Sequence, residues 1–135
     1  MKKATITILT ILLIVTILTS CNDDSSEEQQ TKTEMLTSGK WQGETQKVYT
    51  NNTLTNTIVI TNQDLELLTN HEFKAYTDNI VDTEGNWMLS SDETTITLFG
   101  GANYTVNELT ASKFVFTLYT SIADNETEVK YSYKK

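Results

Sequence analysis

The sequence of 135 residues contains no proline and no arginine, and it has a single cysteine and a single histidine. One cysteine excludes an intramolecular disulfide bond. A zinc site of histidine and cysteine ligands is excluded too, because such a site takes three or four of them. With 18 acids against 10 lysines, the chain is not expected to bind nucleic acid, since that binding depends on basic residues that meet phosphates.

Residues 1–20 have the layout of a secretory signal peptide. Lys2 and Lys3 give a positive start, residues 4–18 form an apolar run interrupted by threonines, and Thr19 and Ser20 are small. A transmembrane anchor is the alternative, but a span needs about 20 apolar residues and this run is shorter. We therefore expect residues 1–20 to be cleaved. The remaining chain has 8 lysines and 18 acids, a net charge of −10, which excludes attachment to anionic lipid by charge.

The only cysteine follows this signal directly, in the stretch Leu18-Thr19-Ser20-Cys21. A spare free thiol is one interpretation. The stretch also resembles the lipobox of bacterial lipoproteins, with a branched apolar residue, two small residues and then cysteine. This resemblance implies signal cleavage between Ser20 and Cys21 and lipid attachment at Cys21, where two or more acyl chains give stable membrane anchoring.

Residues 22–34 contain no apolar side chain. Such a segment has nothing to bury, so we expect residues 21–34, with the lipidated cysteine at their start, to form a disordered acidic tether. The acids after Cys21 are similar to the surface-export signal of Bacteroidetes lipoproteins. The expected location is the cell envelope, lipid-anchored at the outer membrane, with a periplasmic or a surface-facing orientation left open.

Residues 35–135 are rich in threonine, valine, isoleucine and aromatic side chains, which favour β-strands. No window has an apolar period of 3.6 residues long enough to predict a helix. Short alternating runs recur instead, separated by Asn, Asp, Gly and Ser clusters. They predict strands at 40–50, 54–61, 65–68, 73–77, 86–89, 94–99, 104–109, 113–120 and 127–133, with 78–85 as a loop that holds at most a short strand near Ile80 and Val81.

This succession of short strands predicts one all-β domain at 35–135, a small antiparallel up-and-down barrel of about eight strands. Closure of the barrel would remove the exposed sheet edges. An open β-sandwich is the alternative, since strand number does not separate the two. In the first predicted strand, alternation places Trp41, Gly43, Thr45, Lys47 and Tyr49 on one face.

Three stretches of this domain carry a family resemblance. Gly39-Lys40-Trp41 resembles the first signature of the lipocalins, G-x-W. The stretches 84–98 and 104–118 are similar to the repeated hairpins of the short lipocalin-like domains of Bacteroidetes lipoproteins. The resemblance covers nearly all of residues 35–135 and implies a lipocalin-like barrel.

The chain lacks two features of full lipocalins. The Thr-Asp-Tyr signature of the middle of the chain is absent, and so is the arginine that covers the first-strand tryptophan. We expect Trp41 to plug one end of the barrel. In place of the arginine, the methylene stem of Lys130 or Lys134 is expected to cover it.

No arrangement of residues predicts catalysis, so we do not expect an enzyme, a metal site or a cofactor. His71 lies in a predicted polar turn at 69–72, where a histidine is ordinarily solvated. The acids Asp78, Asp82 and Glu84 surround Gly85, but they lack the spacing of an EF-hand calcium loop.

Two functional classes remain for a domain that we expect to be monomeric. In the first, the barrel binds a small hydrophobic or amphipathic molecule at its mouth, near the membrane. In the second, a filled barrel serves as a structural lipoprotein or recognises a protein or glycan through its loops. The large residues expected inside favour a filled or shallow interior, although aromatic side chains also line ligand pockets; they are Trp41, Tyr49, Phe73, Trp87, Phe114, Phe116, Tyr131 and Tyr133.

Overall fold

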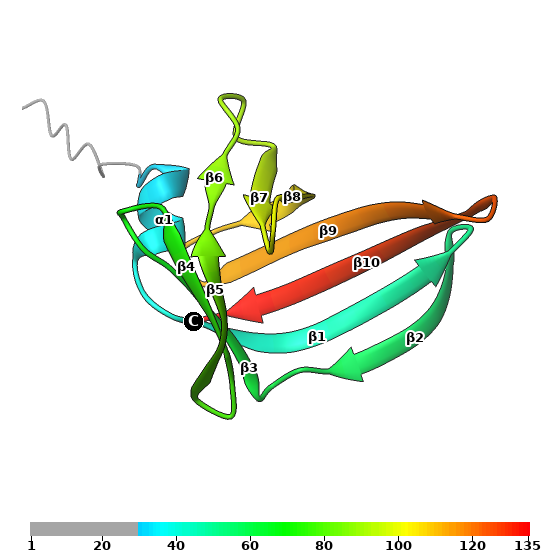
Figure 1. Cartoon of the computed structure of the whole chain (residues 1–135), viewed down its shortest axis with the longest axis horizontal. Coiled ribbons are helices and arrows are strands. Elements are labelled where there is room, and N and C mark those ends of the chain that lie inside the picture. Colours follow the sequence, from blue (N-terminus) through cyan, green and yellow to red (C-terminus); the bar gives the residue numbers. More distant parts are fainter. Residues whose placement is uncertain (1–29) are drawn as a thin grey trace, which may run out of the picture.

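The computed structural model describes residues 30–135, and they form one antiparallel β-sheet with a single short helix (Figure 1). The predicted signal peptide, its cleavage site between Ser20 and Cys21, and residues 21–29 lie outside the described residues. The elements are α1 (Lys32–Thr37), β1 (Trp41–Thr50), β2 (Thr53–Val59), β3 (Gln63–Leu67), β4 (Glu72–Thr77), β5 (Ile80–Asn86), β6 (Met88–Leu89), β7 (Thr95–Leu98), β8 (Ala102–Leu109), β9 (Lys113–Ile122) and β10 (Asn125–Lys134).

The sheet is nearly closed into a barrel, as the sequence predicts. Its strand order is β5-β4-β3-β1-β10-β9-β8-β7-β6, and β2 pairs with the far half of β1. There are ten strands instead of about eight: nine correspond to the predicted runs, and β5 lies where a loop was expected. β2 and β3 pair with successive parts of β1, and β5 leads through Trp87 into β6.

Three hairpins have two-residue turns in which both central residues have positive φ, as in type I′ turns. They join β1 to β2 at Asn51–Asn52, β4 to β5 at Asp78–Asn79, and β9 to β10 at Ala123–Asp124. The first of these confirms the predicted turn at Asn51–Asn52. Asparagine or aspartate, which tolerate this backbone conformation, occupies every central position except Ala123, so tight turns form here without glycine.

Two predictions about local structure are wrong. The loop expected at 78–85 is instead a strand from residue 80 onward: β5 extends well beyond the short strand allowed near Ile80 and Val81 and pairs with β4 over its whole length. Its side chains are mostly exposed on both faces, so no apolar alternation marks it in the sequence. Residues 31–34, expected in the disordered tether, belong to the folded domain: Thr31 and Glu34 form a capping box that starts α1.

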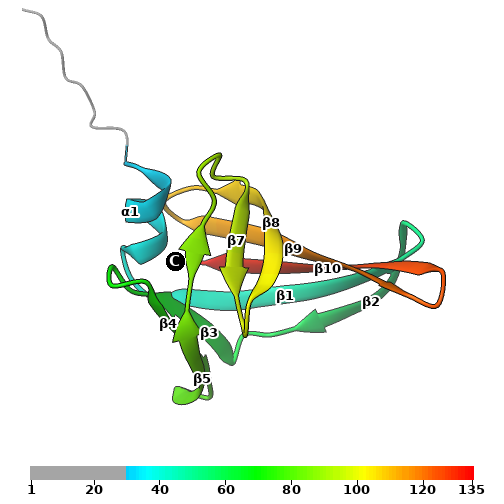
Figure 2. The same ribbon diagram turned by 45° about the horizontal axis from the view of Figure 1, so that its top comes forward.

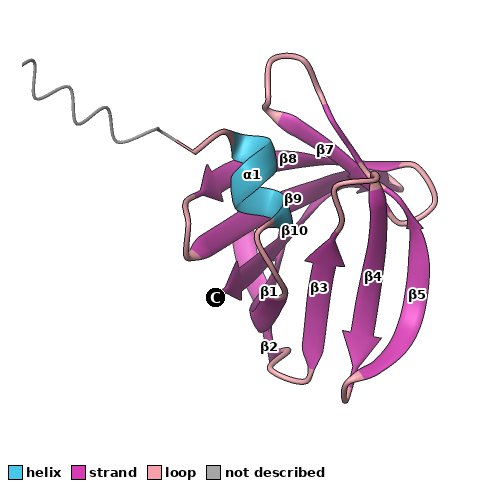
Figure 3. Cartoon of the chain, turned by 90° about the vertical axis from the view of Figure 1, so that its left-hand side faces the viewer, coloured by secondary structure: helices cyan, strands magenta, loops and turns pink. Residues whose placement is uncertain are grey.

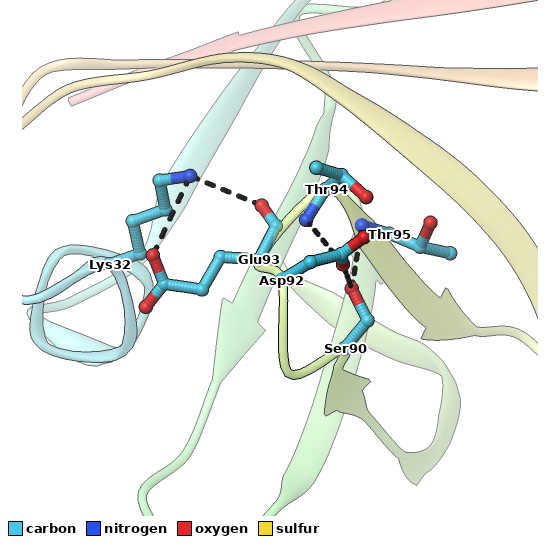
Figure 4. Close-up of polar contacts among 6 residues, drawn as sticks. All are labelled: Lys32, Ser90, Asp92, Glu93, Thr94 and Thr95. Atoms are coloured by element: carbon cyan, nitrogen blue, oxygen red, sulfur yellow. Dashed lines mark hydrogen bonds and ion pairs between the residues drawn. The ribbon is translucent and has the colours of Figure 1, made fainter.

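Helix α1 is fixed to the turn between β6 and β7 (Figure 4). The Lys32 ammonium lies 3.6 Å from the Glu93 carboxylate and donates to the Glu93 carbonyl oxygen at 3.2 Å. Within the turn, hydrogen bonds from Ser90 and Thr94 hold the pKa of Asp92 below its usual value. The helix is thereby fixed across one end of the barrel (Figure 3).

This end, which we call the closed end, contains the first residues of β1 and the last residues of β10. Trp41 is fully buried there and donates through its indole N–H to the Leu36 carbonyl oxygen of α1 at 2.9 Å. The Lys135 ammonium lies 3.9 Å from the centre of the indole ring. Trp41 thus occupies the position expected of a plug, and a lysine covers it, but the lysine is neither Lys130 nor Lys134.

The prediction that one face of β1 carries Trp41, Gly43, Thr45, Lys47 and Tyr49 is also wrong. The pairing of β1 with β10 shifts between Gly43 and Thr45, which is a β-bulge at Glu44. Trp41 and Gly43 face the barrel interior, and the later residues of the series face outward because the bulge reverses the alternation. Gln46 and Val48 face inward in their place.

Candidate functional site

The end of the barrel opposite α1 is hollowed into a cup of about 260 Å³. Its wall comes from the start of β3, the hairpin of β4 and β5, the turn between β7 and β8, the start of β8, the middle of β1 and the second half of β10. The lining residues are Gln46, Gln63, Asp64, Ala75, Tyr76, Thr77, Asp82, Thr83, Phe99, Tyr104, Tyr131 and Tyr133.

Below the cup the barrel is filled by aromatic rings. Phe116 is fully buried and stacks on Tyr131 and Tyr133, with ring centres 5.3 Å and 5.7 Å away. Phe114 continues the column from Phe116 to Trp41 at the closed end, with ring centres 4.7 Å and 5.5 Å away. A ligand can therefore enter only the mouth of the barrel, and the cup is smaller than the 300 Å³ or more of ordinary ligand pockets.

The cup has aromatic and uncharged polar groups, and its only charged lining residues are acids. Tyr104 lies edge-on to Phe99 and to Tyr131, with ring centres 6.1 Å from each. The acids are Asp64 and Asp82, and no lysine contributes to the lining. An arrangement of this kind suits a ligand group that stacks, accepts and donates hydrogen bonds and has no negative charge.

The tyrosines of the cup are neutral at physiological pH. Burial, with a smaller contribution from Tyr131, raises the pKa of Tyr104 to about 12. Burial also raises the pKa of Tyr131, and it raises that of Tyr133 with help from the neighbouring tyrosines and Asp64. The hydrogen bond to Glu66 raises the pKa of the fourth tyrosine of the lining, Tyr76, to about 12. All four phenols therefore keep their protons over the whole physiological range.

Beyond the cup, the far parts of β2, β1, β10 and β9 extend past the other strands (Figures 1 and 2). We call residues 45–59 and 116–131 of these four strands the ribbon. Residues that pair across antiparallel strands share a face, so the pairings define rows of side chains. The row beside the cup contains Ile58, Gln46, Tyr131 and Phe116.

Two further rows lie on this same face of the ribbon, which we call its inner face because it continues the barrel interior. The next row contains Asn56, Val48, Val129 and Leu118, and the last contains Thr53, Thr50, Thr127 and Thr120. No charged side chain occurs in these three rows. The inner face is therefore an uncharged surface that opens directly from the cup.

The opposite, outer face of the ribbon carries charges. Lys47 and Lys130 pair across β1 and β10, and the Lys130 ammonium lies 3.4 Å from the Glu128 carboxylate and 5.6 Å from the ring centre of Tyr49. Tyr49, expected inside the barrel, lies on this outer face. The segregation of charge to one face distinguishes the inner face from an ordinary solvated surface.

Other hollows occur on the outside of the described domain. One of about 330 Å³ lies on the outer face of the ribbon between Tyr119 and Glu128, and a wider one of about 770 Å³ lies beside Trp87 and Met88. The first has no core side chain in its lining, and the second has one, the almost fully buried Trp87. The cup is the candidate site because several strands converge on it and it continues into the uncharged inner face of the ribbon.

The residues that the sequence offered for catalysis or metal binding do not form a site. His71 is exposed in its predicted turn and packs on the Trp87 ring, with ring centres 5.1 Å apart. Asp78 lies in a hairpin turn, while Asp82 and Glu84 lie on β5. Among residues 30–135, no group of three or more histidine, cysteine or acidic side chains is arranged to hold a metal ion.

Several residues of the cup were not predicted. Tyr131 and Tyr133 were expected inside the barrel, but Phe99, Tyr104 and Gln46 were not. Tyr104 alternates with Val106 in its strand, a signal that could have placed it inside. Gln46 faces the cup because of the bulge at Glu44, for which the sequence has no clear signal.

No protein-family model matches the chain, and no curated protein matches its sequence. In the described part of the chain, residues 30–135, no helix combines the length and apolar character that a bilayer crossing requires.

Proposed function

We propose that this protein is a lipid-anchored lipoprotein of the cell envelope, attached through Cys21, whose lipocalin-like barrel binds a small amphipathic or hydrophobic molecule at its mouth. The observation that carries the ligand-binding part is the cup, where aromatic rings and uncharged hydrogen-bonding groups converge at the open end of a filled barrel. The lipobox resemblance carries the anchoring part.

The placement of the two ends of the barrel supports this combination. The described chain begins at Gln30 and leads into α1 at the closed end (Figure 1), whereas the residues that line the cup lie toward the other end of the barrel. A lipid anchor that precedes residue 30 would therefore join the domain on the side away from the cup. The mouth of the barrel would then remain free to receive a ligand from the aqueous phase.

The experiment that tests ligand binding is native mass spectrometry of the protein purified from its own host. We expect a bound small molecule in the spectrum of the unmodified protein. Ala75→Trp is expected to abolish it, because Ala75 lines the cup and an indole in its place fills a cavity of about 260 Å³.

The matched control is Lys74→Trp, since Lys74 precedes Ala75 on β4 and its side chain lies on the opposite face of the strand. This variant should retain the bound molecule. A spectrum of the unmodified protein with no added mass, obtained under conditions gentle enough to preserve a known complex, would contradict the ligand-binding proposal.

Cys21→Ser is expected to stop maturation of the protein. Without the thiol there is no lipid attachment, so the precursor that still carries residues 1–20 should accumulate, and incorporation of labelled palmitate should be lost. Immunoblotting and acyl labelling in the native host measure both effects. Ser20→Ala keeps a small residue before the cysteine and should be processed normally. Normal processing of Cys21→Ser would show that Cys21 is not the lipidation site.

The second candidate function is recognition of a protein or glycan by a filled barrel. It is supported by the aromatic column from Trp41 to Phe116, which leaves only the mouth open. Under this function the Ala75→Trp variant would still recognise its protein or glycan partner in the host. If the function depends on a ligand in the cup, the same variant would lose its function.

A further inference from the structure

The cup and the ribbon together form a longer surface than the cup alone. The cup is about 260 Å³, and the fully buried rings of Phe114 and Phe116 close the barrel below it. A molecule with one end in the cup therefore has to place its remainder outside the barrel. The adjoining surface is the inner face of the ribbon, because Gln46 and Tyr131 belong to both.

The first two rows of that inner face are largely apolar, and their four aliphatic side chains are in contact with water. Val48, Val129 and Leu118 are half-buried, and Ile58 retains 41% of its exposure. These side chains pair in successive rows that lie about 7 Å apart. An apolar chain placed along them would remove their exposed surface from water, which is favourable in proportion to the area covered.

The charges around the cup limit the group that can occupy it. Asp64 and Asp82 are the charged residues of its lining, and the nearest cation, Lys40, lies 4.0 Å from the Asp64 carboxylate and 3.7 Å from the ring centre of Tyr76. An anionic group in the cup would lose water without gaining a cation, which is costly. The raised pKa of Tyr104 has the same physical origin, since burial there disfavours a negative charge.

We propose that the cup and the inner face of the ribbon bind one long-chain amphiphile whose head group has no negative charge, with the head in the cup and the chain along the ribbon. The proposal rests on the ligand-binding function proposed above and specifies its ligand class. It places the chain on the outside of a filled barrel, where the ribbon provides an uncharged surface of three rows.

The test compares three probes with the same ten-carbon chain: decyltrimethylammonium, decyl maltoside and decanoate. The protein, as its own host processes it, is placed in nanodiscs and labelled at valine and leucine methyl groups. Titration is followed by the NMR signals of Val48, Val129 and Leu118, so that partition into the lipid is not scored as binding. The two probes without negative charge should shift these signals, and decanoate should bind at least about tenfold more weakly.

A pair of neighbouring variants on β2 tests the position of the chain. Ile58→Gln changes the inner face and Val59→Gln changes the outer face, where Val59 is 68% exposed. Both replace an exposed aliphatic residue of an edge strand, so neither is expected to unfold the domain. Ile58→Gln should weaken binding of the two favoured probes by about fivefold to tenfold, and Val59→Gln should change it by less than about twofold.

Equal affinity for decanoate and the other probes would overturn the head-group selectivity, and equal effects of the two variants would overturn the position of the chain. In both cases the ligand-binding function itself would stand. Failure of all three probes to bind, while native mass spectrometry still detects a molecule that Ala75→Trp removes, would also overturn only this inference. Failure of the probes together with an empty native spectrum would overturn the inference and the proposed function.

Discussion

Trp41→Ala is expected to lower the free energy of unfolding by about 4 kcal/mol, as measured by urea denaturation followed by circular dichroism. Trp41 is fully buried and contacts the Phe114 ring, with ring centres 5.5 Å apart. Its removal opens a cavity at the closed end and exposes the base of the aromatic column. The substitution also removes the hydrogen bond to Leu36 and the ring that lies beneath the Lys135 ammonium.

Trp41→Phe separates these contributions. Phenylalanine keeps an apolar ring in the barrel but has no indole N–H, so the Leu36 carbonyl oxygen loses its donor. We expect a loss of about 1–3 kcal/mol, smaller than for alanine, because the cavity is only partly opened and one buried acceptor is left without a partner. A loss below about 1 kcal/mol for Trp41→Ala would contradict the role of Trp41 as the plug of the closed end.

The same plug shows how far the sequence resemblance extends. From the sequence we expect Trp41, at the start of the first strand, to plug one end of the barrel. We also expect a lysine, in place of the lipocalin arginine, to cover it. The lysine is Lys135, whose ammonium also donates to the Met35 carbonyl oxygen at 2.8 Å. That Lys135 is the lysine that covers Trp41 could not be predicted, because its position depends on α1, a helix of six residues with a single buried side chain.

Strands were predictable where large apolar side chains alternate with smaller or polar ones and line the barrel interior. Phe114 and Phe116 alternate with polar residues or valine on β9, and their pairing with Tyr133 and Tyr131 on β10 confirms that the four side chains share a face. β5 lacked this signal because both of its faces are largely exposed. Alternation of apolar and polar residues arises because one face of a strand is buried, so the sequence of a strand that is exposed on both faces does not alternate in this way.

The composition of the cup was only partly predictable, for a different reason. Tyr131 and Tyr133 follow from the alternation of β10, but Gln46 reaches the cup through the bulge at Glu44. A bulge moves every later residue of the strand to the other face, so a single extra residue exchanges Lys47 and Tyr49 for Gln46 and Val48. The uncharged inner face of the ribbon is a consequence of this shift.

Substitution of Gly43, the residue before that bulge, is the second change for which we expect a large loss of stability. A Cβ atom at Gly43 would lie 2.3 Å from the carbonyl oxygens of both Ile60 and Gln63. Gly43→Ala is therefore expected to lower the free energy of unfolding by about 3 kcal/mol, because backbone atoms, unlike the end of a flexible side chain, cannot move aside without disturbing their own hydrogen bonds. Urea denaturation measures the change, with the thermal midpoint as a second readout.

Gly85→Ala is the matched control, since Gly85 also has close neighbours inside the barrel. Its Cβ would lie 3.0 Å from the edge of the Phe73 ring, a side-chain contact, so we expect a smaller loss of about 1 kcal/mol. Equal losses of unfolding free energy for the two variants would mean that the backbone at 60–63 moves to accommodate the added methyl group at little cost. The larger loss is expected at Gly43 because this residue of β1 lies against the link at 60–63, where β2 ends and β3 begins. That link is held by hydrogen bonds: the Ile60 N–H donates to the Glu44 carbonyl oxygen at 3.1 Å, and the Gln63 N–H donates to the Ile60 carbonyl oxygen at 2.8 Å. Because Gln63 and Tyr133, the partner of Gly43 on β10, both line the cup, displacement of this link should also weaken ligand binding at the mouth.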